Sequence, residues 1–163
     1  MFREMRRKRQ ELSGEEAEKI LREGTSGVLA VEGDGGYPYA VPLSYAWDSG
    51  KLLFHCARSG HKLDAVKRNP KASFCVIGQD RVIPDEYTTA YRSVIAFGRI
   101  RILTEDREIR SAAERLGLRY APHHTKERRD QEINKEWSRL CMLEMTVEHL
   151  TGKEGLSLLK ERE

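Results

Sequence analysis

Three strand-like segments follow one another near the start of the chain with only a few residues between them. The runs SGVLAVEG (26–33), PYAVPLSYAW (38–47) and LLFHCA (52–57) are rich in β-branched and aromatic residues. They are joined by DGGY (34–37) and DSGK (48–51), and both linkers are hairpin signals. Parallel neighbours need a crossover of a dozen or more residues, so these short gaps exclude βαβ units. This feature predicts an antiparallel arrangement.

The remaining segments add helices and further strands without any linker that would divide the chain. Residues 12–24 predict a helix that Ser13 caps, with Glu16 completing a capping box and Gly24 at its end. We predict further helices at 59–70, capped by Ser59, and at 105–120. Further strands are predicted at 71–78, 91–103 and 139–152. Residues 79–90 are predicted to be a polar turn region, and residues 121–132 a loop or frayed turn. The order predicts a mainly β fold, a small antiparallel barrel with helices plugging its ends. One domain, 1–163, with a basic N-terminal arm, 1–11, is expected.

Composition limits the setting and the partners. The chain has 163 residues, of which 39% are hydrophobic, and a formal net charge of +3. Its three cysteines form no CxxC pair, and it has neither a signal peptide nor an apolar run of the ~20 residues that span a bilayer. Glu4 interrupts the basic arm, which lacks interleaved aromatic residues. We therefore predict a cytoplasmic protein with no membrane or nucleic-acid partner.

The stretch FHCARSGHKLDAV (54–66) concentrates reactive groups and raises three hypotheses. A metal site is disfavoured because His55 and Cys56 are adjacent on a strand and point to opposite faces. A nucleophile built from Cys56 and His61 lacks a third, orienting group, and a lone strand cysteine is more often a small buried side chain. We predict no metal site and regard the nucleophile as the weaker hypothesis.

The third hypothesis is an anion site at the start of the 59–70 helix. The first turn of a helix exposes free N–H groups and a positive dipole end. His61 and Lys62 lie in that turn and Arg58 just before it, although cations there oppose the dipole. A bound phosphate would explain both the cations and the open amides. From the residue types alone, solvated surface charges explain the stretch equally well.

Pro42 is a local anomaly because it removes a hydrogen-bond donor from an otherwise good strand. It is expected at a sheet edge, at a bulge or where the backbone faces a ligand, and from the strand alone an edge is preferred.

Several long blocks resemble one family in order along the chain. MFREMRRKRQELS, TSGVLAVEGDGGYPYAVPLSYAW, LLFHCARSGHKLDAVKRNPKASFCVIG and YRSVIAFGRIRIL are similar to the Nim-type, 5-nitroimidazole resistance branch of the pyridoxamine 5′-phosphate oxidase-like flavoproteins. The resemblance extends from Met1 through EHLTGKEG (148–155). It implies a six-stranded antiparallel split β-barrel that forms a homodimer, with FMN at the subunit interface.

The resemblance also implies roles for individual residues. His61 and Lys62, with Arg58, would hold the FMN phosphate. Trp137 and Arg139 are looser candidates for closing the site. The flavin ring would be lined by three segments: Val41, Pro42, Leu43, Ser44 and Tyr45; His55, Cys56 and Ala57; and RSVIAFG (92–98) with Ser93 and Phe97, from the partner. A ligand beside Pro42 would then explain the strand anomaly.

The function expected from the resemblance is an FMN-dependent oxidoreductase that reduces small nitroaromatic or related acceptors. His55 is the candidate catalytic residue, and a core or interface histidine that only packs is the equal alternative. A flavin carrier or sensor, a haem- or F420-binding relative and a pyridoxamine phosphate oxidase proper also stay open. The ending LSLLKERE argues against the last, because it lacks the arginine- and proline-containing ending associated with that enzyme.

Overall fold

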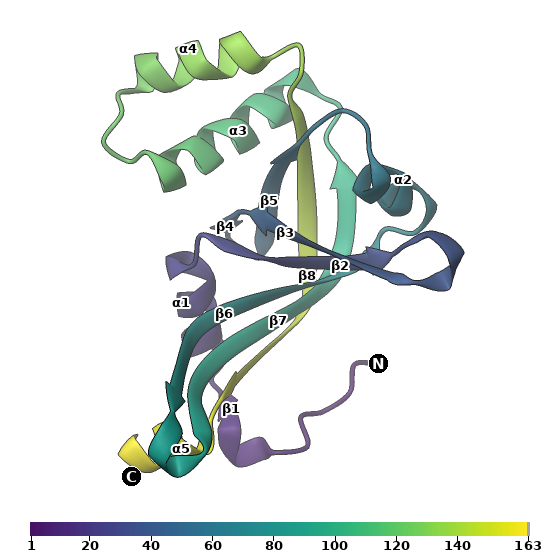
Figure 1. Cartoon of the computed structure of the whole chain (residues 1–163). Coiled ribbons are helices and arrows are strands. Elements are labelled where there is room, and N and C mark those ends of the chain that lie inside the picture. Colours follow the sequence, from purple (N-terminus) through teal and green to yellow (C-terminus); the bar gives the residue numbers. More distant parts are fainter. Residues whose placement is uncertain (163) are drawn as a thin grey trace.

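The computed structural model describes residues 1–162 and contains a single antiparallel sheet with five α-helices around it (Figure 1). The strands are β1 (Glu11–Leu12), β2 (Ser26–Glu32), β3 (Pro38–Ser44), β4 (Ala46–Asp48), β5 (Lys51–Cys56), β6 (Lys71–Ile83), β7 (Thr88–Ile102) and β8 (Cys141–Glu154). The helices are α1 (Gly14–Glu23), α2 (His61–Arg68), α3 (Asp106–Tyr120), α4 (Lys126–Glu136) and α5 (Leu156–Arg162). Within residues 1–162, no helix has the length and apolar character to cross a membrane.

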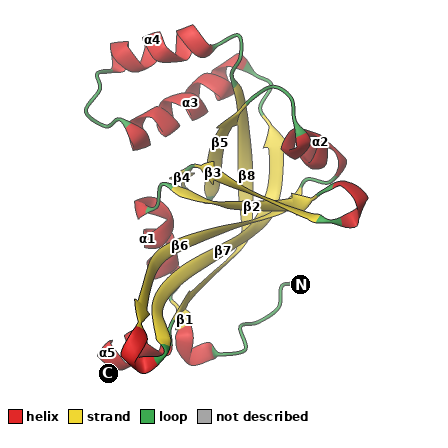
Figure 2. Ribbon diagram, in the orientation of Figure 1, coloured by secondary structure: helices red, strands yellow, loops and turns green. Residues whose placement is uncertain are grey.

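The predicted fold class, a mainly β antiparallel barrel with helices, is confirmed. The strand order is β3-β2-β6-β7-β8-β5-β4, with β1 paired to β8. Eight strands replace the six expected, because β1 adds a short pair and the predicted strand 38–47 breaks at Tyr45 into β3 and β4. These two strands lie at opposite edges of the sheet and are joined through one residue. The sheet therefore curls back toward itself, as Figure 2 shows.

One predicted irregular segment is wrong, and another is wrong in part. Residues 79–90 are not a turn region, because β6 and β7 continue through them as a long hairpin closed by a 3-10 turn at Pro84–Glu86. The predicted loop at 121–132 is right for residues 121–125 and wrong from Lys126 on, where α4 begins after Thr125 accepts a hydrogen bond from the Arg128 amide. The capping box of α1 and its end at Gly24 are confirmed. The cap of α2 is Gly60 and not Ser59, and it makes no side-chain capping bond.

The inner face of the sheet carries the main core. Tyr45, Phe54 and Phe74 are fully buried there, and both Tyr45 and Phe54 meet the Phe74 ring edge-on with centroids 5.0 Å apart. Helix α1 contributes Ala17 and Leu21, and α2 contributes Leu63, Ala65 and Val66 to the same cluster. This packing fixes α2 against the sheet and so positions its first turn.

The outer face of the sheet is divided into two halves. One half is covered by the α3–α4 hairpin, which packs Ala113 and Leu116 over Leu53 and Met142 in a second cluster. The other half, here called the open half, is not covered by the hairpin: Val28, Ile77 and Ile95 are exposed on it, and Phe2 of the N-terminal arm lies against Phe97 and His149. A β-bulge between Phe97 and Gly98 lies in β7, where a Cβ at Gly98 would come within 2.0 Å of the Thr146 carbonyl oxygen. This close backbone contact requires glycine at position 98.

Candidate functional site

Strand β5 presents His55 and Cys56 to opposite faces of the sheet, as predicted. His55 pairs with Met142 and Cys56 with Cys141 in the β5–β8 register. The His55 side chain lies on the outer face and is exposed, so it is not a core residue of the single chain. Within residues 1–162 it makes no hydrogen bond or ion pair. It is therefore available to a ligand.

A pocket of about 340 Å³, here called the apolar pocket, opens beside His55. The inner side of the hairpin supplies most of its wall, because Ala113, Leu116, Gly117 and Tyr120 follow one another at helical spacing on α3. Its polar groups are few, as is typical of small-molecule sites. The full lining is Ser44, His55, Ala113, Leu116, Gly117, Tyr120, Glu132, Ile133, Glu136, Leu140 and Met142.

A second cavity of about 480 Å³ continues from the first along the end of β5. It is lined by His55, Cys56, Ala57, Glu136, Arg139 and Leu140. His55, Glu136 and Leu140 line both cavities, so the two cavities adjoin, and together they are here called the trough. The trough ends at Ala57, four residues before the start of α2. The trough therefore reaches the segment that leads into the helix start that the sequence singled out.

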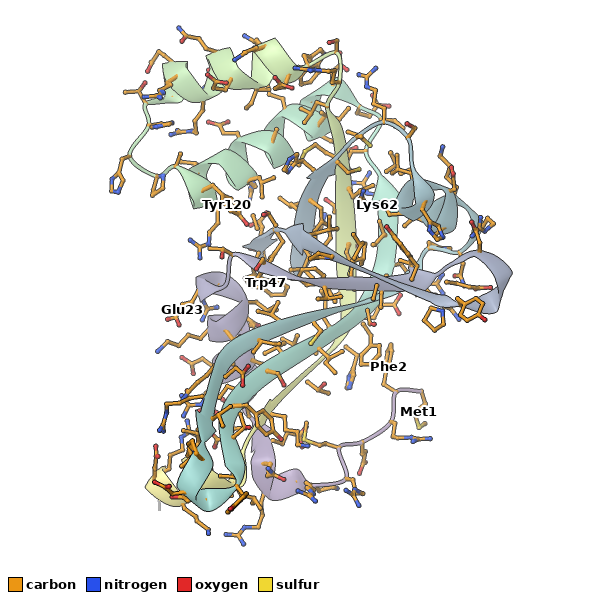
Figure 3. The ribbon with its side chains drawn as sticks, viewed as in Figure 1. Met1, Phe2, Glu23, Trp47, Lys62 and Tyr120 are labelled. Atoms are coloured by element: carbon orange, nitrogen blue, oxygen red, sulfur yellow. The ribbon has the colours of Figure 1, made fainter. Side chains whose placement is uncertain are left out.

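The first turn of α2 has the donors that a phosphate requires. Gly60 begins the turn with φ 132°, and no atom lies within 4 Å of a Cβ built there, so the space beside it is open. Lys62 is half-buried near the strands and makes no hydrogen bond or ion pair within residues 1–162 (Figure 3). Amides of a first helical turn and a free ammonium group are suitable ligands for an anion. The residues present therefore fit the phosphate of a flavin nucleotide.

His61 and Arg58 are already engaged by other parts of the chain. The His61 Nε2 accepts a hydrogen bond from the Asp34 amide at 3.3 Å, and its ring lies against Tyr39 with centroids 4.0 Å apart. The proton of the neutral ring is then on Nδ1, which remains a donor. The Arg58 guanidinium donates to the Trp137 and Leu140 carbonyls at 3.2 and 3.3 Å. Arg58 thus joins the segment before α2 to the corner between α4 and β8.

The expected ring-lining residues of β3 divide between the two faces of the strand. Pro42 and Ser44 are exposed on the outer face, whereas Val41 and Leu43 pack against the core. Tyr45 is fully buried, and its hydroxyl donates to the Leu21 carbonyl at 2.8 Å. Of this set, only Ser44 lines the apolar pocket. Pro42 lies on an edge strand, which confirms the edge interpretation of that residue.

The remaining expected residues lie in two places. Ser93 and Phe97 are on the outer face of β7 beside Ile95, away from the trough, and Phe97 lies 6.1 Å from the His149 ring. Trp137 is the C-cap of α4, and the Arg110 guanidinium lies 4.8 Å from its ring centroid. Arg139 lines the trough and bonds Glu136 at 2.8 Å. The fold therefore brings together Ser44, His55, Cys56, Ala57 and Arg139, with Arg58 and Trp137 behind the trough wall.

Cys56 has the properties of a half-buried, protonated thiol and not of a nucleophile. Burial, with Cys141 as its cross-strand neighbour, raises the pKa of Cys56 to about 12, although the nearby Lys62 acts in the opposite direction. A thiol with such a pKa is almost fully protonated at neutral pH, and the thiolate is the reactive form. Among residues 1–162, no three His, Cys, Asp or Glu side chains gather where they could hold a metal ion.

A separate cavity of about 440 Å³, here called the charged pocket, lies farther along β5 and α3. Its central carboxylate is Glu144, which accepts from Lys51 at 3.1 Å and from Arg101 at 2.9 Å. Arg101 also bonds Glu108 of α3 at 2.7 Å, and Arg115 of α3 pairs with Asp48 of β4. These ion pairs satisfy one another and attach α3 to the sheet, so this cavity is part of the structural framework.

Sequence reasoning missed the wall of the apolar pocket that α4 supplies. Glu132, Ile133 and Glu136 line it, but the segment that begins α4 was expected to be a loop. Two signals in the sequence could have identified the helix. Thr125 precedes it at the N-cap position, and Lys126 and Asp130 form an i,i+4 pair at 2.6 Å.

Solved structures of similar fold include flavoproteins. A protein from Bacteroides thetaiotaomicron, proposed to confer 5-nitroimidazole antibiotic resistance, has a TM-score of 0.72 and 16% identity, with 88% of this chain and 86% of that chain covered. A FAD-binding protein from Mesorhizobium loti has a TM-score of 0.61 and 23% identity, with coverage of 90% and 97%. The FAD and haem binding protein from Mycobacterium smegmatis has a TM-score of 0.73 and 22% identity, with coverage of 90% and 73%. At these identities the likeness shows the fold.

The sequence itself identifies the family. None of the curated proteins matches this chain. Residues 13–154 match the family described as pyridoxamine 5′-phosphate oxidase. That range begins at the cap of α1 and ends with β8, so it contains the whole sheet except β1, together with the trough and the start of α2. The chain therefore belongs to the pyridoxamine 5′-phosphate oxidase family.

Proposed function

We propose that the chain binds a flavin nucleotide, FMN, along the trough and transfers electrons from it to small acceptors such as nitroaromatic compounds. The observation that carries this proposal is the position of the trough, which runs from Ala57, four residues before α2, past the exposed His55 into the apolar pocket. An anion site joined to an apolar cavity suits a ligand with a phosphate at one end and a flat ring at the other. Two solved structures of the same fold belong to FAD-binding proteins, which supports a flavin as the cofactor, and the choice of FMN rests on the family resemblance.

Each part of the site would have a separate task. The amides at the start of α2 and the Lys62 ammonium would neutralise the phosphate, with the Nδ1–H of His61 as a further donor. Arg58 would keep the wall formed by residues 137–140 in place, because it bonds two carbonyls of that wall. When bound, the flavin supplies the redox chemistry, either hydride or single-electron transfer. The α3–α4 hairpin would exclude water from one side of the acceptor.

His55 is the proposed catalytic residue. Its side chain is exposed on the outer face of β5, without a protein partner within residues 1–162, and lines both parts of the trough. A histidine in this position can donate a hydrogen bond or a proton to an acceptor as that acceptor gains negative charge. In this proposal His55 acts on the acceptor, whereas Lys62 acts on the cofactor.

A homodimer is part of the proposal and rests on the open half of the outer sheet face. Val28, Cys75 and Ile95 lie opposite one another across β2, β6 and β7, and Val28 and Ile95 are each 39% exposed. Ile77 on the same face is 65% exposed. Contiguous exposed apolar side chains of this kind mark association surfaces. A second copy placed on this surface would bring its Ser93 and Phe97 to the interface.

The experiment begins with the purified chain under reducing conditions, which match the cytoplasmic setting that the sparse cysteines suggest. We expect a yellow protein with flavin absorption bands, or one that takes up added FMN to one equivalent per chain. Anaerobic turnover of NAD(P)H with a nitroimidazole then separates a reductase from a flavin carrier. A colourless protein that does not take up FMN contradicts the proposed cofactor. Flavin binding without turnover supports the carrier instead.

A further inference from the structure

We propose that the apolar pocket is a binding site for a small, flat, uncharged or cationic aromatic molecule, and that it rejects anionic ones such as phosphate monoesters. Its role as the acceptor site rests on the proposed function, but the binding itself does not. The pocket of about 340 Å³ is near the lower end of the range for small-molecule sites. It therefore suits a molecule of one or two rings.

The lining of the pocket contains carboxylates but no lysine or arginine. Glu132 and Glu136 both come from α4, one helical turn apart, and so face the pocket together. Glu136 is paired with Arg139 at 2.8 Å, whereas Lys135 approaches Glu132 only to 3.9 Å on the exposed side. An anionic ligand would lose its hydration without gaining an unpaired cation, because Arg139 of the adjoining cavity is already paired with Glu136, and it would meet the negative charge of Glu132.

The remaining walls favour a flat apolar body with one polar end. Leu116 and Met142 are buried and provide apolar surface on two sides, while Gly117 leaves room between them. His55 and Ser44 are the polar groups on the sheet side, close to the proposed flavin position. The substrate named by the family, a 5′-phosphate, is anionic, so this pocket sets the chain apart from an oxidase of that substrate.

The far end of the pocket is anchored and not free to swing open. Tyr120 lies at the C-terminal end of α3, facing the strands and α1 (Figure 3). Its hydroxyl donates to the Thr25 carbonyl and accepts from the Tyr45 amide at 3.2 Å. Arg119 beside it donates to the Glu23 and Gly24 carbonyls. The cavity is therefore a preformed site, which lowers the ordering entropy that a ligand must overcome.

The test compares three probes that share one ring: 4-nitrobenzyl alcohol, 4-nitrobenzylamine and 4-nitrobenzoate. Isothermal calorimetry measures their dissociation constants with the chain, both with and without FMN. We expect the alcohol and the amine to bind at least tenfold more tightly than the benzoate. Equal affinity for the benzoate overturns the proposal. Because calorimetry needs no bound flavin, a chain that binds the probes but not FMN overturns the proposed function and leaves the pocket assignment supported.

Two substitutions localise the probes. Gly117→Leu fills the pocket, and its Cβ meets only the Arg129 side chain, at 3.4 Å, while leucine favours the helix. We expect tenfold weaker binding of 4-nitrobenzyl alcohol with no loss of melting temperature. Glu132→Lys should invert the preference, so that the benzoate binds more tightly than the amine. Ser111→Leu, on α3 in the charged pocket, is the control and should leave all three constants unchanged.

Unchanged affinity in Gly117→Leu places the probes elsewhere and overturns the proposal. If instead a second copy of the chain fills the pocket, none of the probes binds and Gly117→Leu converts dimer to monomer in sedimentation. That result also overturns the proposal that the pocket binds a small aromatic molecule.

Discussion

The apolar pocket and the charged pocket are built from the same two elements but serve different purposes. Both lie between α3 and β5. Ala113 and His55 line the apolar pocket, and Ala112 and Leu53 line the charged pocket. In the charged pocket every carboxylate is paired with a lysine or arginine, and within residues 1–162 Arg107 alone of the lining charges has no ion pair, so the cavity has little left to offer a ligand. In the apolar pocket His55 has no partner within residues 1–162. The difference shows that a cavity becomes a candidate site through its unpaired groups and not through its volume.

This contrast predicts that substitutions on the two sides will affect different properties of the molecule. In the charged pocket, substitutions should change the free energy of unfolding and leave ligand affinities unchanged. At the exposed polar groups of the apolar pocket, such as His55, they should change binding or turnover and leave stability unchanged.

The largest expected effect is on turnover, from His55→Ala. Loss of a group that donates to the acceptor should lower the rate of nitroaromatic reduction by about a hundredfold, the low end of the contribution of general acid–base residues. FMN affinity and melting temperature should not change, because the side chain is exposed. Stopped-flow reoxidation of the reduced flavin by a nitroimidazole measures the rate. An unchanged rate means that His55 only packs at an interface.

The next effect is on stability, from Glu144→Gln. The Glu144 side chain is 11% exposed and accepts from both Lys51 and Arg101. Removing its charge should lower the free energy of unfolding by roughly 1–2 kcal/mol, less than for a fully buried pair because both cations are half-exposed. Urea titration followed by circular dichroism measures this change. Glu108→Gln, on the exposed side of the same network, is the control and should have a smaller effect. A weaker affinity for 4-nitrobenzyl alcohol would show that the two pockets are coupled.

The smallest expected effect is the pH dependence that Glu144 contributes. Burial alone would raise the pKa of this carboxyl, but the hydrogen bonds from Arg101 and Lys51 outweigh it and hold the pKa below its usual value of 4.5. A carboxyl with a lowered pKa stabilises the fold above its unfolded-state pKa, and that stability is lost as the pH falls through its folded value. The wild-type chain should therefore lose more stability than Glu144→Gln when the pH is lowered below about 4.5. Parallel losses in the two proteins would remove Glu144 as the cause.

Much of the fold could be predicted because its signals are local. The hairpin linkers between residues 26 and 57 required antiparallel strands, and the Ser13–Glu16 capping box identified α1. Strand alternation separated His55 from Cys56 correctly. These features depend on residues a few positions apart, so no knowledge of the tertiary fold was needed.

The failures came where tertiary contacts decide the structure. Residues 79–90 look polar, yet they form strands because β6 and β7 continue as a hairpin beyond the barrel. Helix α4 has a low mean hydrophobic content and buries none of its residues, so its pattern carries no amphipathic signal. Arg58 stays a prediction for the phosphate, and its bonds to two carbonyls 79 and 82 residues away were not predicted. No local pattern encodes such distant partners.

The most direct test of the central claim, that a flavin phosphate binds at the start of α2, compares FMN with riboflavin, which lacks the phosphate. Fluorescence quenching titrations give both affinities for the wild-type chain, for Lys62→Ala and for a control, Lys67→Ala, in the exposed last turn of α2. We predict that FMN binds at least tenfold more tightly than riboflavin. Lys62→Ala should weaken FMN binding about tenfold, the effect of losing one charge-assisted contact, and leave the riboflavin affinity unchanged. Equal affinities for the two flavins, or an FMN affinity unaffected by Lys62→Ala, would contradict the account.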